Sequence, residues 1–129
     1  MTNLLKVTME RESVCAGDDV DAPHGDSICI PQDCTLAQAL DLIRNKGYLA
    51  CIAGGHATWI AESSRPLAVM AQQWTSPRFL LAPETHLVEC VELSGGRALF
   101  FRYWCQADPE VVFDCLEKGR ALPDRYGRA

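Results

Sequence analysis

The chain has 129 residues, of which 48% are hydrophobic and 22% are charged, and these values are typical of a globular protein and exclude a disordered one. A single domain covering residues 1–129 is expected, large enough to bury a core without metals or disulfides. No apolar run reaches the roughly 18 residues of a membrane span, and the start of the chain lacks the basic and apolar regions of a secretory signal.

The net charge of −5 is concentrated in the first quarter of the chain. Residues 1–35 contain seven acids and two bases, whereas residues 36–129 contain ten of each. An acidic surface repels nucleic acid and anionic membranes, and it attracts a basic partner at long range. The charge pattern therefore predicts a basic protein partner and no binding to nucleic acid or membrane.

The chain begins with an expected strand and a long acidic loop. Residues 1–14 include the alternation of apolar and polar side chains that a half-buried strand has. Residues 15–34 then contain five aspartates, and a loop of this length is often functional. Ile28 and Ile30 are expected to attach part of the loop to the sheet as a short edge strand that ends at Pro31.

Two helices are expected. The first, at residues 35–46, begins with Thr35 and Gln38 at the spacing of a capping box. The second, at residues 108–118, begins with Asp108 as its N-cap and a proline at the first helical position. Apolar residues at helical spacing give each helix one buried stripe. These are Leu36, Ala39, Leu40 and Ile43 in the first helix, and Val111, Val112, Cys115 and Leu116 in the second.

The region 48–105 is expected to supply the remaining strands. Strand-length apolar runs separated by turn residues predict a three-stranded meander followed by a second hairpin. Consecutive strands without helices between them favour an antiparallel sheet. The expected fold is α+β, a mainly antiparallel sheet of five to seven strands with both helices on one face, followed by a loose tail at 119–129. The three runs are 48–53, 56–62 and 67–74, and the second hairpin is 86–105.

Neither a metal site nor a disulfide framework is expected, and no cofactor. The seven cysteines are an odd number, several lie in apolar runs, and reduced thiols in a cytoplasmic protein fit this pattern. His24, Cys29 and Cys34 lie close in sequence but lack the two tight ligand pairs of a zinc site. The segment 18–26 lacks the spacing of a calcium loop.

No catalytic motif is present, so we expect a protein that is not an enzyme. One alternative is a small cysteine- or histidine-dependent enzyme with a site near Cys15 and His24, because a thiolate beside an imidazole is a nucleophile. Labelling of one cysteine far faster than the others at neutral pH would favour it. Another alternative is a homodimeric structural module that pairs through an exposed strand edge.

Two stretches carry a resemblance to a known class of proteins: SVCAGDDVDAPH after the first strand, and GGHATWIAESSRPLAVMAQQW across the expected meander. They resemble small cytoplasmic immunity proteins of bacterial polymorphic or contact-dependent toxin systems. The resemblance implies a toxin inhibitor that binds a cognate toxin domain and blocks it without catalytic residues of its own. Many such toxins are nucleases with basic clefts, and their inhibitors tend to be acidic.

The expected partner-binding residues are mostly acids in and beside the long loop. An acidic loop can neutralise the lysines and arginines that a nuclease uses to hold phosphate. A tryptophan beside two glutamines at a strand end can serve as an anchor of an interface. The predicted site consists of Glu10, Glu12, Asp18, Asp19, Asp21, Asp26 and Trp74.

Overall fold

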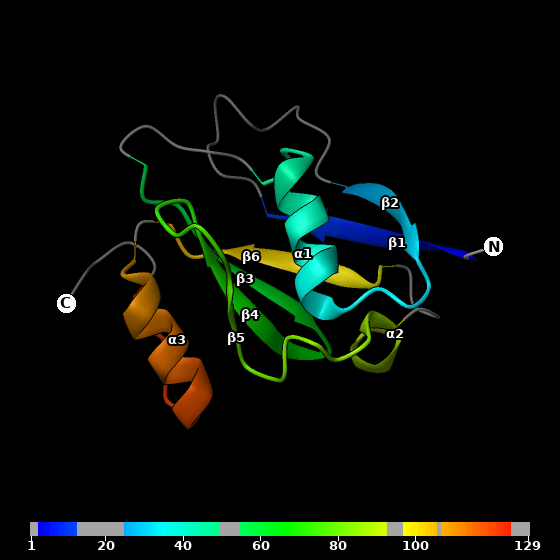
Figure 1. Cartoon of the computed structure of the whole chain (residues 1–129). Coiled ribbons are helices and arrows are strands. Elements are labelled where there is room, and N and C mark those ends of the chain that lie inside the picture. Colours follow the sequence, from blue (N-terminus) through cyan, green and yellow to red (C-terminus); the bar gives the residue numbers. More distant parts are fainter. Residues whose placement is uncertain (1–2, 13–24, 50–54, 93–96, 106, 125–129) are drawn as a thin grey trace.

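The computed structural model describes residues 3–12, 25–49, 55–92, 97–105 and 107–124. These residues form an α+β fold with one six-stranded sheet and three helices (Figure 1). The strands are β1 (Leu4–Arg11), β2 (Gly25–Pro31), β3 (Thr58–Ser63), β4 (Arg65–Ala71), β5 (Arg78–Phe79) and β6 (Leu99–Tyr103). The helices are α1 (Leu36–Asn45), α2 (Leu87–Cys90) and α3 (Pro109–Lys118).

The sheet has the order β2-β1-β6-β3-β4-β5 and is mostly antiparallel, which confirms the predicted fold class. The pair β1–β6 is parallel, with Met9 opposite Leu99, so the sheet is mixed. This pairing joins segments that are far apart in the chain, and no local pattern in the sequence predicts it. Among the described helices, none is long and apolar enough to span a membrane.

The first expected helix is confirmed as α1, and its capping box is present. The Thr35 hydroxyl accepts from the Gln38 N–H at 3.2 Å, and the Gln38 side-chain oxygen accepts from the Thr35 N–H at 3.0 Å. Gly47 follows the helix with a φ of 78°, a left-handed conformation that suits glycine. The short strand predicted to end at Pro31 is confirmed as β2, which therefore takes up part of the expected loop.

The expected second hairpin at 86–105 is wrong in its first half. The return strand is present as β6, but Leu87–Cys90 is the one-turn helix α2. Leu87 and Cys90 are both buried, and residues three apart lie on the same side of a helical turn. The apolar residues of this segment therefore fit a helical turn as well as they fit the alternation of a strand. In the expected meander, β3 and β4 form a hairpin, whereas Tyr48 and Leu49 are not in a strand; residues 50–54 lie outside the described residues.

The expectation that both main helices cover one face is also wrong. Trp59 and Ala61 of β3 pack in the cluster that contains the buried side chains of α1. Ile60, between them, packs instead with Val112 of α3. Successive side chains of a strand point to opposite faces, so α1 and α3 lie on opposite sides of the sheet. The central strands β3 and β4 are buried on both faces and need cover on each side.

The buried stripe of α3 is narrower than expected. Val112 is fully buried, but Val111 is 45% exposed. Cys115 and Leu116 are partly buried. The predicted start of α3 is confirmed: the Asp108 side chain accepts from the Glu110 N–H at 3.0 Å, and Pro109 is in the first turn. The helix ends at Gly119, whose φ is 68°.

Candidate functional site

The described members of the predicted site lie at strand ends that are not level with one another. β1 ends beside the start of β2, with Glu10 opposite Gly25, and the Tyr103 N–H donates to the Glu12 carboxylate at 2.8 Å. Through β6 and β3, Glu10 is level with the start of β4, whereas Trp74 follows the end of β4. Glu10 and Trp74 are therefore separated by two intervening strands and also along the strand direction.

Glu10 and Asp26 do not form a single patch. Asp26 is directly opposite Met9 across the β1–β2 pair, and Met9 is buried in the cluster beneath α1. Directly opposite residues project from the same face of a sheet, so Asp26 is on the α1 face. Glu10 follows Met9 along β1 and therefore projects from the other face.

Both carboxylates also have partners within the chain. Glu10 forms an ion pair with Arg97 at 3.1 Å, and Asp26 forms one with Lys46 at 2.9 Å. The hydrogen bonds from Lys46 and from the Ser27 N–H lower the pKa of Asp26. All four charged side chains are well exposed, and exposed ion pairs contribute little to stability. Lysines or arginines of a partner can therefore replace Arg97 and Lys46 in these ion pairs with little loss of folding stability.

Trp74 has a structural role in addition to the predicted one. Its half-buried side chain packs against the α3 cluster, and the Arg78 guanidinium lies over its ring at 4.8 Å. Arg44 of α1 donates to the carbonyl oxygens of both Trp74 and Ala71. These contacts tie the turn after β4 to α1 and α3. The ring borders a shallow surface pocket of about 330 Å³ that also includes Gln73 and Arg78.

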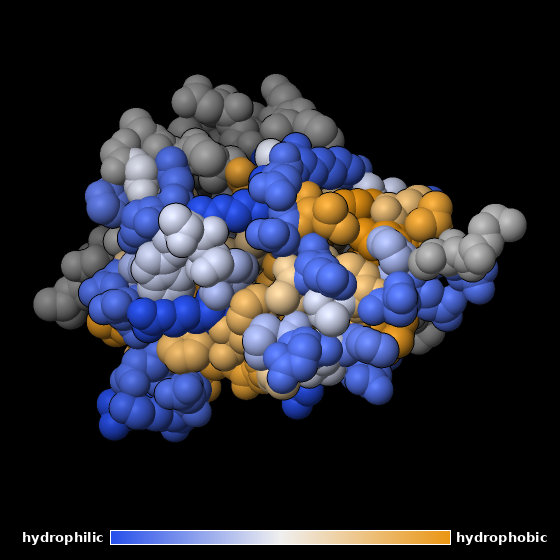
Figure 2. Space-filling view, viewed as in Figure 1, coloured by the Kyte–Doolittle hydropathy of each residue, from blue (hydrophilic) through white to orange (hydrophobic). Residues whose placement is uncertain are grey.

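A second acidic surface was not predicted from the sequence. It is an open groove of about 560 Å³ between the β2–α1 connection and the outer side of α1, and it includes Asp33 and Asp41. Within the described part of the chain, neither carboxylate has an ion-pair partner. Leu42 beside them is 43% exposed. In Figure 2, hydrophobic side chains reach the surface over α1 and β2 among hydrophilic ones.

The signal for this groove was present in the helix pattern. The exposed positions of α1 recur at helical spacing and form one outward stripe opposite the buried one. A leucine in such a stripe is an apolar side chain without a place in the core. The stripe consists of Gln38, Asp41, Leu42 and Asn45.

Five of the predicted residues lie outside the described residues: Asp18, Asp19, Asp21 and, from the alternative site, Cys15 and His24. Burial raises the pKa of Cys34 and of Cys90, so these thiols stay protonated at neutral pH. In the described ranges, no three His, Cys, Asp or Glu side chains gather in a way that could hold a metal ion.

Comparisons with known proteins add no family to this description. No protein-family model, no curated protein and no solved structure matches the chain. The distribution of charge and the geometry described above are therefore the observations that bear on function.

Proposed function

We propose that this protein is a cytoplasmic immunity protein, an inhibitor that binds a cognate cationic toxin domain through acidic side chains. The observation that carries the proposal is the charge distribution, with seven acids and two bases in residues 1–35 and equal numbers of each in the rest. A nuclease domain with a basic cleft is the kind of partner that such a charge distribution attracts and orients.

The described geometry supports a binding role in two ways. First, Asp33 and Asp41 line an open groove and have no ion-pair partner among the described residues, so they can pair with a cation at no internal cost. Second, the ion pairs of Glu10 and Asp26 are exposed and can be exchanged for contacts with a partner. In this proposal Asp18, Asp19 and Asp21 supply the remaining charge.

The test is binding to the product of the adjacent gene, co-expressed and purified with this protein. Replacing Asp18, Asp19 and Asp21 by asparagine removes three charges from the first quarter of the chain. We expect the dissociation constant to rise at least about tenfold, because several partly screened charge pairs are lost together. Titration calorimetry measures the change.

A matched control separates this effect from a general loss of charge. Glu84, Glu89 and Glu117 are exposed and lie outside residues 1–35, and their replacement by glutamine removes the same total charge. We expect this control to bind as the unmodified protein does. Equal affinities of the two triple variants would contradict the proposal.

A further inference from the structure

The outer edge of β2 has an unusual arrangement at Ser27. The carbonyl oxygen of Thr8 in β1 accepts from the Ala98 N–H at 2.8 Å, so the backbone groups of Thr8 point toward β6. In an antiparallel pair, the residue opposite such a position also points its N–H and C=O away from its neighbour. Ser27 is the residue opposite Thr8, and its backbone groups therefore point out of the sheet.

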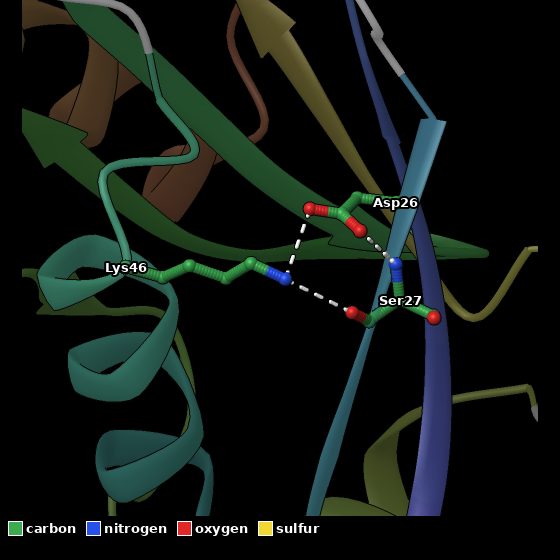
Figure 3. Close-up of polar contacts among 3 residues, drawn as sticks. All are labelled: Asp26, Ser27 and Lys46. Atoms are coloured by element: carbon green, nitrogen blue, oxygen red, sulfur yellow. Dashed lines mark hydrogen bonds and ion pairs between the residues drawn. The ribbon is translucent and has the colours of Figure 1, made fainter.

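Two side chains form hydrogen bonds with the N–H and the carbonyl oxygen of Ser27 (Figure 3). The Ser27 N–H donates to the Asp26 carboxylate at 2.8 Å. The Lys46 ammonium, just after α1, donates to the Ser27 carbonyl oxygen at 3.1 Å and pairs with the same carboxylate at 2.9 Å. We call this arrangement the Asp26–Lys46 cap. It lies where the backbone of a further strand would have to bind.

The far end of β2 is closed by other means. Pro31 has no N–H to donate, and its carbonyl oxygen accepts from the Cys34 N–H at 3.0 Å. Outward-pointing residues alternate along a strand, so the remaining outward positions are Gly25, Ser27 and Cys29. Ser27 is the central one of the three. A strand that adds to this edge must therefore displace the Asp26–Lys46 cap.

We propose that the Asp26–Lys46 cap keeps the edge of β2 closed to strand addition, and that β2 of a second copy of this chain adds there when the cap is removed. An unprotected strand edge is a template for pairing with another chain. An antiparallel register with Ser27 opposite Ser27 pairs Gly25 with Cys29 in both directions and avoids Pro31. In this register the outward backbone groups of Gly25, Ser27 and Cys29 in one strand face those of Cys29, Ser27 and Gly25 in the other. The proposal is independent of the immunity function.

The test is self-association of the full chain with Asp26→Ala and Lys46→Ala combined. We expect the dissociation constant of a dimer to fall at least about tenfold relative to the unmodified chain, measured by light scattering over a range of protein concentrations. Hydrogen exchange should show new protection at the Ser27 and Cys29 amides in the dimer. Both substituted side chains are well exposed, so the fold should persist, which circular dichroism checks.

A matched control removes another exposed ion pair from the surface. Lys118 and Asp114 of α3 form such a pair at 2.8 Å, and their replacement by alanine should leave the chain monomeric. If the double variant unfolds, the single variant Asp26→Ala is the second test, because it frees the Ser27 N–H and removes the carboxylate that pairs with Lys46; a smaller gain in dimer affinity is expected. A folded cap variant that stays monomeric would overturn the proposal. A dimer without protection at Ser27, or equal association of the control, would overturn it as well.

Discussion

The two faces of the sheet differ in how much they bury. The face under α1 carries a large cluster that combines α1, α2 and five strands, and it includes fully buried side chains such as Leu40 and Phe101. The face under α3 has a small cluster with Ile60, Val69, Trp104 and Val112 at its centre. Most of the stability should therefore come from the α1 side. The groove that includes Asp33 and Asp41 lies along α1, on the side of the larger cluster.

The largest expected effect is on the α1 face. Replacing the fully buried Leu40 by alanine should lower the free energy of unfolding by about 2–5 kcal/mol, because the cavity remains in a packed core. Leu42 in the same helix is 43% exposed and is the matched control, for which we expect a change within about 0.5 kcal/mol. Urea denaturation measures both. Similar losses for the two leucines would contradict the placement of the α1 core.

A smaller effect is expected on the α3 face. Replacing the buried Val112 by alanine removes two methyl groups and should cost about 1–2 kcal/mol. Its neighbour Val111 is 45% exposed, and alanine there should change the stability by less than about 0.5 kcal/mol. In native-state hydrogen exchange, the amides of α3 should open at lower free energy than those of α1. Equal protection of the two helices would remove the distinction between the faces.

A still smaller effect is expected at the start of α1. Replacing Thr35 by alanine breaks the capping box with Gln38 and should cost about 1 kcal/mol. Serine at this position retains the hydroxyl and should restore most of the loss. Thermal unfolding of the two variants makes the comparison, and equal destabilisation by alanine and serine would show that the methyl group, not the hydrogen bond, matters.

The last prediction concerns Tyr48, whose ionisation changes the stability only in alkaline solution. Burial beneath the α1 face raises the pKa of Tyr48 to about 12, although the nearby Arg11 charge opposes this shift. The folded-state pKa is above the usual value of about 10, so this stabilisation is complete below pH 10 and is lost as the pH rises from 10 through 12. The variant Tyr48→Phe should lose less stability than the unmodified chain over this range. Urea denaturation at a series of alkaline pH values tests this, and parallel curves would contradict it.

Local signals in the sequence predicted local structure well. The capping residues Thr35 and Asp108 marked the starts of both long helices, and alternation identified β1. Pro31 correctly ended an edge strand. These features depend on residues that are close in the chain, so a single sequence contains the whole signal.

The sequence could not predict long-range arrangement. The parallel pairing of β1 with β6 depends on contacts between Met9 and Leu99, which lie far apart in the chain. The same holds for the faces chosen by α1 and α3. For the candidate site, the acids were identified by charge, but the internal ion pairs of Glu10 and Asp26 are made with residues from distant segments. The outward stripe containing Asp41 and Leu42 could have been found from helical spacing.

If this protein recognises its partner through acidic side chains, as we propose, its affinity should depend on the screening of charge by salt. The most direct measurement is the dissociation constant for the adjacent gene product at a series of salt concentrations, with the unmodified chain and with Asp33→Asn combined with Asp41→Asn. We expect an affinity that falls steeply as the salt concentration rises, and a weaker dependence in the double variant, because fewer screened charge pairs remain. An affinity that does not change with salt, in either protein, would contradict recognition through acidic side chains.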